Sequence, residues 1–425
     1  MADPKPTPIS AKRTTRRVKR PSREAIITPT TTPEQSSRSS KSGKGRSEKS
    51  RVSNNEKRVR NAPSKEVIAR SASKETVEDN TQRATKPASS TPSAAQDNKK
   101  RKAATVKPGR AQPKFTPEQD SAADKFCNYI KSTPAEQIVS DFEKVQTYPE
   151  KKGDCEVCKK NTAKNRYGDV HCLDATRVEL KTDFGNYTSA DGDYIHANWI
   201  SFDYLERKYI ATQGPKDNTI EDFWRMVFQE NVAAIVCVCN FVEGGQSKCA
   251  EYFPINAGEY KNYGKMFVNN KKVDDIVYTL EVLPDGCSNS IVTKLIFCTE
   301  WPDKGMPTKG GIPLKIRRLT REAGTGPVVV HCSAGIGRTG TYILIEMAIQ
   351  KLLKGKEPVM IDLYKDLRDC RASSVQNTQQ YLYAYSSVLD FIITRRIEYK
   401  PLKTKFLKDL CEIMEEAAAA DPRPN

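Results

Sequence analysis

The segment from Val328 to Gly340 reads Val-Val-Val-His-Cys-Ser-Ala-Gly-Ile-Gly-Arg-Thr-Gly and predicts three kinds of local structure in succession. Its β-branched start is typical of a short buried strand. Small residues and two glycines then predict a tight loop. Beyond Arg338 a helix is predicted, because apolar or small residues recur at helical spacing at Thr341, Leu344, Ile345, Ala348, Ile349 and Leu352.

The predicted loop has the properties of an anion-binding site. Its small side chains let successive backbone N–H groups converge on one point, with the dipole of the following helix behind them. Arg338 adds a planar, two-pronged donor that suits phosphate oxygens. The segment therefore predicts binding of a dianionic phosphate group.

Cys332 lies at the mouth of this loop, and its position indicates a nucleophile. A cysteine in the positive field of a helix N-terminus is held more readily as the reactive thiolate. A nucleotide-binding P-loop is excluded, because no lysine follows the loop glycines. A buried, inert cysteine is the other alternative, and the spacing to Arg338 within a glycine loop argues against it.

The pattern His-Cys-x5-Arg-Thr-Gly resembles the signature of the cysteine-dependent protein tyrosine phosphatases. The resemblance covers about residues 115–395 and is closest to a non-receptor type with a single catalytic domain. It implies an α/β (α+β) fold, in which a twisted mixed β-sheet is flanked by helices. The signature loop is then expected at the carboxyl end of a strand.

Two segments upstream resemble the parts of this family that recognise the substrate. Residues 164–170 resemble the phosphotyrosine-recognition loop, where Tyr167 would form one wall of a deep slot and Asp169 would accept a peptide N–H. Gly168 stands where many members carry a basic residue. Residues 193–200 resemble a structural motif of the family, and His196 replaces its usual Asn as a structural variation.

Three further segments resemble parts of the family's catalytic machinery. In residues 243–249, Glu243 matches the glutamate that pairs with the signature arginine in the family. Lys248 matches a lysine that reaches the active site. In residues 301–307, a mobile acid loop is implied, with Trp301 as a hinge, Asp303 as the general acid and Lys304 in place of the common Phe. Residues 375–381 resemble the loop whose glutamines position water.

The resemblance thus implies a complete set of site residues, without metal or cofactor. The catalytic group is Cys332, Arg338, Asp303, Thr339, Gln376 and Gln380. The substrate-binding group is Tyr167, Asp169, Lys248, Ser333, Ala334, Gly335, Ile336 and Gly337. The supporting group is His331, Glu243 and Trp301.

The expected function is hydrolysis of phosphotyrosine in proteins through a cysteinyl-phosphate intermediate, in signal transduction. A phosphotyrosine-binding pseudophosphatase with weak or no turnover is the alternative. The expected partners are proteins that contain phosphotyrosine, and the catalytic domain is expected to be a monomer.

The positive charge of the chain belongs to its N-terminal part. Residues 1–110 hold 28 Lys and Arg against 10 Asp and Glu, whereas the remaining residues hold 42 against 43. The tail has no aromatic residue before Phe115 and no leucine before Leu173, so it is predicted to be disordered. The predicted division is a basic tail at 1–112, a catalytic domain at 113–398 and a C-terminal helix or tail at 399–425.

Two dense basic clusters in the tail, residues 12–20 and 99–102, leave its role open. Four roles are compatible with such a tail, namely a solvated linker, a nuclear import signal, a patch that binds acidic membranes and a nonspecific nucleic-acid-binding segment. Acidic partners and import receptors are the binding partners that these clusters predict. No apolar run approaches the roughly 18 residues of a membrane span, and the N-terminus lacks an apolar signal region.

The 12 cysteines show no disulfide framework, and a lone Cys155-x-x-Cys158 is a weak indication of zinc. These features predict a reducing setting, so the expected location is the cytoplasm or the nucleus.

Local patterns predict several further elements. Thr116-Pro117 and Thr133-Pro134 both have the form of a helix start, with a Thr cap and Pro at the first helical position. The apolar run 233–239 predicts a strand buried on both faces. Residues 273–282 and 291–300 are each predicted to form one strand.

Overall fold

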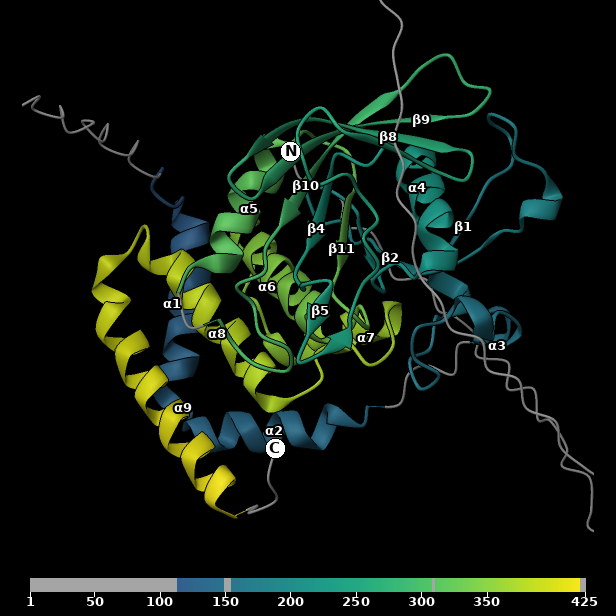
Figure 1. Cartoon of the computed structure of the whole chain (residues 1–425). Helices are drawn as coiled ribbons and strands as arrows, with labels where there is room; N and C mark the ends of the chain where they lie inside the picture. The colour runs from purple at the N-terminus through teal and green to yellow at the C-terminus, as the bar shows by residue number, and fades with distance from the viewer. Residues whose placement is uncertain (1–112, 149–153, 308–309, 421–425) are drawn as a thin grey trace, which may run out of the picture. The chain divides into compact units, whose positions relative to one another are not determined.

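A computed structural model of the chain describes residues 113–148, 154–307 and 310–420. Within these ranges the strands form a nine-stranded mixed sheet and a separate two-stranded one, and helices flank the larger sheet (Figure 1). This architecture confirms the predicted fold. The disorder predicted for residues 1–112 lies outside the described residues.

Four parallel strands form the centre of the large sheet, in the order β3 (Tyr209–Thr212), β11 (Val328–His331), β4 (Ala234–Cys237) and β10 (Ile291–Phe297). Antiparallel strands extend both sides of this centre, namely β1 (Arg177–Glu179), β2 (Tyr194–Ile200), β9 (Val277–Pro284), β8 (Met266–Asp274) and β7 (Tyr260–Tyr263). The small sheet pairs β5 (Val242–Glu243) with β6 (Gln246–Ser247).

The two innermost strands, β11 and β4, consist almost wholly of apolar residues because they are covered on both faces. Every residue of β4 and β11 is buried, as the continuous run at 233–239 and the start of the signature segment predict. The strand that precedes the signature loop is therefore held rigidly within the core.

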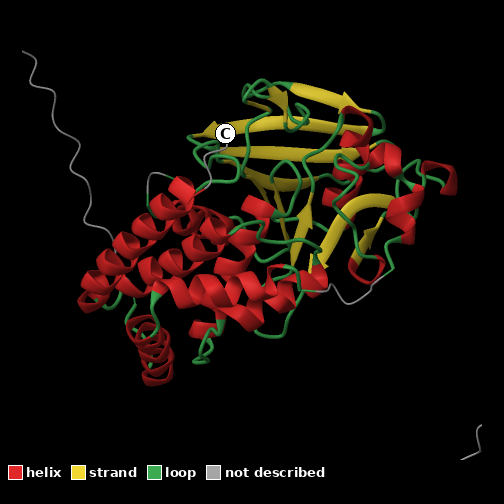
Figure 2. Cartoon of the chain, turned by 90° about the horizontal axis from the view of Figure 1, so that it is seen from below, coloured by secondary structure: helices red, strands yellow, loops and turns green. Residues whose placement is uncertain are grey.

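Helices cover the sheet on both sides. The longer ones are α1 (Pro117–Ser132), α2 (Ala135–Gln146), α4 (Ile220–Gln229), α5 (Ile312–Glu322), α6 (Gly337–Leu353), α7 (Met360–Cys370), α8 (Thr378–Ile393) and α9 (Lys400–Ala420). Most of them gather on one side of the strands (Figure 2), where α5 and α6 pack on the central strands. The helix α4 packs on β2, β8 and β9. A short helix, α3 (Glu156–Lys160), precedes β1.

One predicted helix start is confirmed and the other is wrong. Thr116 caps α1 in a capping box with Gln119, and Pro117 is the first helical residue. Thr133 does not cap α2: it is the C-cap of α1, and α2 begins at Ala135 with Pro134 as an N-cap that offers no side-chain hydrogen bond. The two helices are so close in sequence that Thr133 still belongs to the end of α1, and the N-cap of α2 is the next residue, Pro134.

The strand predicted for residues 273–282 is present as β9, but it begins at Val277, and the residues before the turn belong to β8. The chain reverses between β8 and β9, where Asp275 takes a left-handed conformation with φ +54°. Aspartate tolerates this conformation better than β-branched residues do, so the Asp274-Asp275 pair marks a turn. The second predicted strand is present as β10.

The C-terminal helix α9 packs on the helical layer through Phe406 and Leu410, which are buried against it. No helix in the described part of the chain is long and apolar enough to cross a membrane.

The parallel strands decide where the candidate site lies. The carboxyl ends of β3, β4, β10 and β11 lie at the same edge of the sheet, and the segments after them include the signature loop and the predicted acid loop. Sites in such sheets form at this edge, where loops from several strands meet.

Candidate functional site

The signature loop connects β11 to α6 in a conformation that requires glycine at position 335. Gly335 has φ +70°, and a Cβ there would lie 2.0 Å from the carbonyl oxygen of Thr212. A Cβ on Gly337, the first residue of α6, would lie 2.2 Å from Gln376 Oε1. The loop is thus pressed against β3 on one side and the glutamine loop on the other.

Arg371 fixes the direction of the loop's peptide groups. This fully buried side chain donates from Nη2 to the Ala334 carbonyl and from Nε to the Gly335 carbonyl, both at 3.1 Å. With these carbonyls turned outward, the N–H groups turn inward, and the Gly335 N–H lies 3.3 Å from Cys332 Sγ. The N–H of Gly335 therefore points at the sulfur of the nucleophile predicted from the sequence.

Arg338 is held in place by a bidentate ion pair. Its Nη1 and Nη2 atoms lie 2.7 and 2.9 Å from the two carboxylate oxygens of Glu243, the partner that the sequence predicts. Nη1 also donates to the Trp301 carbonyl at 3.0 Å. Its Nε is buried without a hydrogen-bond partner among the described residues, which is rare in folded proteins.

Asp303 reaches into the same site from the acid loop. Its carboxylate lies 3.1 Å from Arg338 Nη2 and 2.9 Å from Lys248 Nζ. Burial disfavours the charged carboxylate, but the Lys248 hydrogen bond and the charge of Arg338 outweigh this effect, and the pKa of Asp303 lies below its usual value. Asp303 therefore favours its ionised form, in which it pairs with both Arg338 and Lys248.

The acid loop is anchored at its hinge and at its tip. Trp301 is fully buried against Tyr383, with ring centroids 5.3 Å apart, and donates to the Gly305 carbonyl at 3.2 Å. Lys304, the departure from the common Phe, has φ +56°, and its carbonyl accepts from Asn377 Nδ2 at 2.9 Å. Asn377 Oδ1 accepts the Gln380 N–H, so this side chain joins the acid loop to the start of α8.

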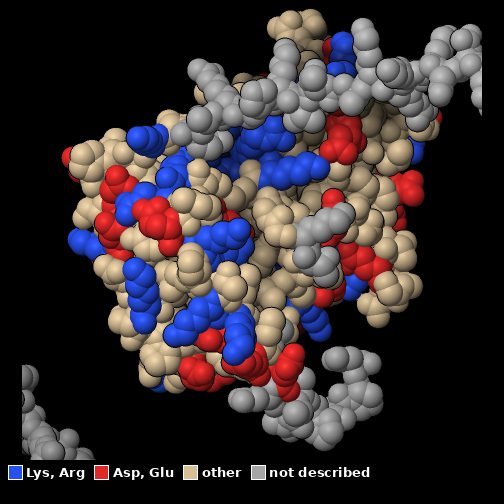
Figure 3. All heavy atoms as spheres, turned by 90° about the vertical axis from the view of Figure 1, so that its left-hand side faces the viewer, with Lys and Arg blue, Asp and Glu red and all other residues tan. Residues whose placement is uncertain are grey.

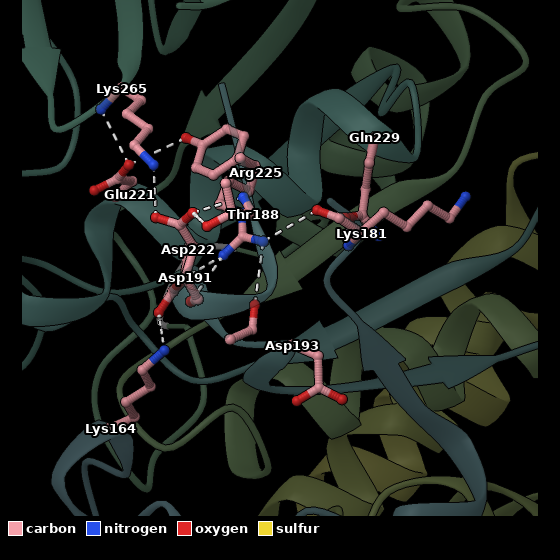
Figure 4. Close-up of polar contacts among 12 residues, drawn as sticks. Lys164, Lys181, Thr188, Asp191, Asp193, Glu221, Asp222, Arg225, Gln229 and Lys265 are labelled. Atoms are coloured by element: carbon pink, nitrogen blue, oxygen red, sulfur yellow. Dashed lines mark hydrogen bonds and ion pairs between the residues drawn. The ribbon is translucent and has the colours of Figure 1, made fainter. Parts of the chain in front are cut away.

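Tyr167 forms a side of the site, and its loop is held by ion pairs. Its hydroxyl lies 2.8 Å from Ser333 Oγ. Figure 4 shows Lys164, at the start of the same loop, reaching Asp222 at 2.8 Å, and Asp222 lies in turn 3.4 Å from buried Arg225. The recognition loop is thereby fixed to α4.

The glutamine loop packs directly behind the signature loop. Gln380 is buried, and its Oε1 accepts the Gln376 N–H at 2.9 Å, whereas Gln376 itself is exposed. Gln380 Nε2 and Thr339 Oγ1 are buried without a hydrogen-bond partner among the described residues. Such unpaired groups are rare in folded proteins, and here both adjoin the predicted site.

His331 lies beneath the nucleophile and is fully buried. Its Nδ1 lies 3.2 Å from the Cys332 carbonyl and its Nε2 lies 2.7 Å from the Tyr252 hydroxyl. In the described ranges, His331, Cys237 and Cys239 form the one group of three metal-type side chains that lie within 4.8 Å of one another. Both nitrogens of His331 already have partners, so the group offers no free imidazole to a metal.

These side chains surround a cleft of about 490 Å³. The predicted residues that line it are Tyr167, Asp169, Lys248, Asp303, Cys332, Ser333, Ala334, Ile336 and Gln376. The others lie behind this lining and support it, namely Arg338, Thr339, Gln380, Gly335, Gly337, His331, Glu243 and Trp301. Lys304 and Arg368, which the sequence does not assign to the site, add positive charge to the lining.

Arg371 and His196 hold the loop in place without having been predicted to do so. His196 Nδ1 accepts from Arg371 Nη1 at 3.0 Å, and its Nε2 bonds the Val170 carbonyl at 3.0 Å. His196 thus joins the recognition loop to the signature loop. The one indication of this role in the sequence is that Arg371 lies shortly before the glutamine loop. Nothing in its neighbouring residues indicates that Arg371 contacts the signature loop, which lies about 36 residues upstream.

The environment of His196 predicts an acid-sensitive fold. Burial, reinforced by the charge of Arg371, lowers the pKa of His196 to about 3. At a pH below the ordinary histidine pKa of about 6.5, His196 binds a proton in the unfolded chain but stays neutral in the folded chain. The free energy of unfolding should therefore fall by up to about 1.4 kcal/mol per pH unit below that value, and urea unfolding between about pH 7 and pH 5 would measure it.

His196→Asn removes this titration and should flatten the slope. His171→Asn, at an exposed histidine, is the matched control and should leave the slope as in the wild type. Equal slopes for the wild type and His196→Asn would show that His196 is not the group responsible.

Comparison with known proteins gives one family. A model of the protein-tyrosine phosphatase family matches residues 161–390. Receptor-type tyrosine-protein phosphatase zeta of Rattus norvegicus is 36% identical over 254 residues, which are 56% of this chain and 11% of that protein. Tyrosine-protein phosphatase non-receptor type 9 of Homo sapiens is 32% identical over 289 residues, which are 63% of this chain and 48% of that protein.

Receptor-type tyrosine-protein phosphatase C of Homo sapiens is 36% identical over 240 residues, 54% of this chain and 18% of that protein. The chain thus spans about half the length, or less, of these relatives. The shared region contains the signature loop, the acid loop and the recognition loop described above.

Proposed function

This chain belongs to the protein-tyrosine phosphatase family, and on that premise we propose that it hydrolyses phosphotyrosine in proteins through a cysteinyl-phosphate intermediate. One observation carries the proposal: Cys332, Asp303 and Lys248 line one cleft, and Arg338 contacts Asp303 from behind it. These are a nucleophile, an acid and two cations, the set that transfer of a phosphoryl group from an aryl oxygen requires.

In the first step the Cys332 thiolate attacks phosphorus, and the bond from phosphorus to the phenol oxygen breaks. The inward N–H groups of residues 333–337 and the Arg338 fork stabilise the phosphoryl oxygens as charge shifts. Asp303 gives its proton to the departing phenol oxygen. The incoming dianion displaces the Asp303 carboxylate from Arg338, and its negative charge favours the protonated acid.

In the second step water cleaves the cysteinyl phosphate. Gln376 and Gln380 place the water, and the Asp303 carboxylate takes its proton while the phosphorus–sulfur bond breaks. The unpaired Thr339 hydroxyl donates to the departing thiolate, and inorganic phosphate leaves. His331 holds the Cys332 carbonyl throughout.

Selectivity for phosphotyrosine follows from the depth of the slot. Tyr167 is tied to Ser333 beside the nucleophile and so forms a tall wall. A phosphate at the end of an aromatic ring reaches Cys332 past this wall, whereas the shorter phosphoserine does not. Asp169, at the exposed rim, accepts a backbone N–H of the substrate.

The test compares peptides that differ only in phosphotyrosine or phosphoserine. We expect release of inorganic phosphate from the phosphotyrosine peptide and at least about 100-fold less from the phosphoserine peptide, because only the first reaches the nucleophile. Comparable rates for both would contradict the tyrosine specificity.

Two departures favour a second candidate, a domain that captures phosphotyrosine without turnover. Lys304 replaces the common Phe beside the acid, and Gly168 stands where many members carry a basic residue. Tight binding of the phosphotyrosine peptide with no phosphate release would select this candidate.

Asn377 provides a test of the acid loop's position. Asn377→Asp keeps the oxygen that caps α8 but loses the donor to the Lys304 carbonyl. A lost hydrogen bond of about 0.5–1.5 kcal/mol corresponds to a kcat reduced by roughly 2–10-fold. The KM should change little and the melting temperature should stay close to that of the wild type.

Asn377→Ala is the companion variant, because it loses the cap as well and should lower both kcat and stability. If Asn377→Asp keeps the wild-type kcat, the contact with Lys304 does not position the acid.

We assign the catalytic domain to residues 113–398, acting as a monomer in signal transduction, and a C-terminal helix or tail to 399–425. We assign the basic tail, residues 1–112, a role in location, through acidic partners or import receptors. On this proposal the protein acts in the cytoplasm or the nucleus.

A further inference from the structure

The chain enters the glutamine loop in a backbone conformation that few side chains tolerate. Ser373 has φ +58° and Val375 has φ +60°, both in the left-handed region, where a β-branched residue such as valine is a clear outlier. Strained segments of this kind persist only where the surrounding contacts hold them. The contacts of Val375 and of the next residue, Gln376, therefore decide where the Gln376 side chain lies.

The backbone of this segment is held from three directions. The Val375 N–H donates to the Ile336 carbonyl of the signature loop at 3.0 Å. The Gln376 N–H donates to Gln380 Oε1 at 2.9 Å, and the Gln376 carbonyl accepts from Gln146 Nε2 at 3.1 Å. The first two contacts come from the signature and glutamine loops, whereas Gln146 lies 230 residues earlier in the chain.

Gln146 is the last residue of α2 and contacts the site a second time through its backbone. Its carbonyl accepts from Nη1 of Arg368, which belongs to α7 and lines the cleft of Cys332. The side chain of Gln146 thus bonds to the glutamine loop and its carbonyl bonds to α7. The end of α2 is fastened to two parts of the site at once.

A buried aromatic ring fixes the direction of this helix end. Phe142 lies four residues before Gln146, on the same face of α2, and is fully buried. Its ring stacks on Tyr381 with centroids 4.4 Å apart and meets Tyr364 at 5.3 Å. Since Tyr381 directly follows Gln380 in sequence, this packing sets the position of α2 against the start of α8.

The helices on which α2 packs, α8 and α9, are themselves joined by charged pairs. The face that α1, α5, α8 and α9 present carries clusters of basic and acidic side chains (Figure 3). Arg396, just beyond α8, lies 2.7 Å from Asp120 and 3.2 Å from Asp124 of α1. Lys403 of α9 pairs with Asp390 of α8. The donor of Gln146 is therefore presented to the glutamine loop from a fixed helical layer.

We propose that Gln146 is a positioning residue for the second step of the reaction. It holds the Gln376 carbonyl, and through the backbone it holds the Gln376 side chain where water is placed for attack on the cysteinyl phosphate. This inference rests on the proposed hydrolysis and extends it to α2, which precedes the part of the chain that matches the family model, residues 161–390.

Loss of the Gln146 donor should affect one step and spare the other. In the second step the water oxygen bonds to phosphorus, the phosphorus–sulfur bond breaks and the Asp303 carboxylate takes the proton. Without the donor the strained backbone can relax, and Gln376 then holds the water less well. The first step depends on Cys332, Arg338 and Asp303 and makes no use of Gln376.

The test measures which acceptor receives the phosphoryl group. The full chain is given p-nitrophenyl phosphate together with ethylene glycol, whose hydroxyl competes with water for the cysteinyl phosphate. The ratio of glycol phosphate to inorganic phosphate reports the second step alone, whichever step limits the overall rate. Gln146→Met keeps the length of the side chain and loses the donor, so the ratio should rise about 2–10-fold, the effect of one lost hydrogen bond.

Two further variants complete the design. Gln137→Met makes the same change in the same helix, at an exposed residue whose amide donates to Asp141, and should keep the wild-type ratio. Gln146→Asn keeps an amide at the half-buried position but is too short to reach the Gln376 carbonyl, so it should also raise the ratio. The first turnover, followed as release of p-nitrophenol, should have the wild-type rate in all variants.

A wild-type ratio in both Gln146 variants would overturn the proposal. An equal slowing of the first turnover and of phosphate release would overturn it as well, because a general distortion of the domain affects both steps. A wild type that releases no p-nitrophenol would instead refute the proposed hydrolysis, which is a separate result.

Discussion

Cys332→Ser should abolish turnover of a phosphotyrosine peptide, with a rate at least about 10⁴-fold below that of the wild type. A serine hydroxyl stays protonated at neutral pH, and no contact that the described residues make with this side chain supplies a base for it. The loop N–H groups and the Arg338 fork are unchanged, so the peptide should still bind. Phosphate release and equilibrium binding on the same preparation separate these two effects.

A second measurement identifies the intermediate. Rapid acid quenching of the wild type with a radiolabelled peptide should trap phosphate on Cys332, and the serine variant should trap none. Cys411→Ser is the matched control, since it makes the same substitution at an exposed cysteine of α9. Turnover above about a tenth of the wild-type rate in Cys332→Ser would exclude this cysteine as the nucleophile.

Asp303→Asn should lower kcat by about 10²–10⁴-fold, the usual contribution of a general acid. Asparagine fits the same space beside Lys248 and Arg338 but has no proton to give to the phenol oxygen. Substrate binding should be retained or tightened, because the carboxylate no longer competes for Arg338. Single-turnover kinetics with a phosphotyrosine peptide measure the chemical step directly.

Two controls test this prediction: substrates whose leaving groups differ in acidity, and the dependence of the rate on pH. An aryl phosphate whose phenol is acidic needs no proton, so the deficit of Asp303→Asn should shrink with such a substrate. The wild-type rate should fall as pH rises and Asp303 loses its proton, and the variant should lack this decline. A deficit of the same size with both leaving groups would mean that Asp303 acts through position and not as an acid.

Elements whose cause is local could be predicted from the sequence. The strand, loop and helix of residues 328–353 follow from β-branched residues, glycines and helical spacing within one short segment, and the cap of Thr116 follows from a four-residue pattern. The two errors in the predicted elements also concern local structure. Thr133 was expected to cap α2 but ends α1, and the turn at Asp275 lies inside a run of residues that is otherwise typical of a strand.

The sequence by itself determined the family, the identity of the candidate nucleophile and the division of charge between tail and domain, because each depends on residue types at fixed spacing. Only the tertiary structure decided how the site is held. Arg371 orients the signature loop, Asn377 joins the acid loop to α8, and His196 joins the recognition loop to Arg371. Side chains far apart in sequence make these contacts, and the packing of the sheet and helices brings them together.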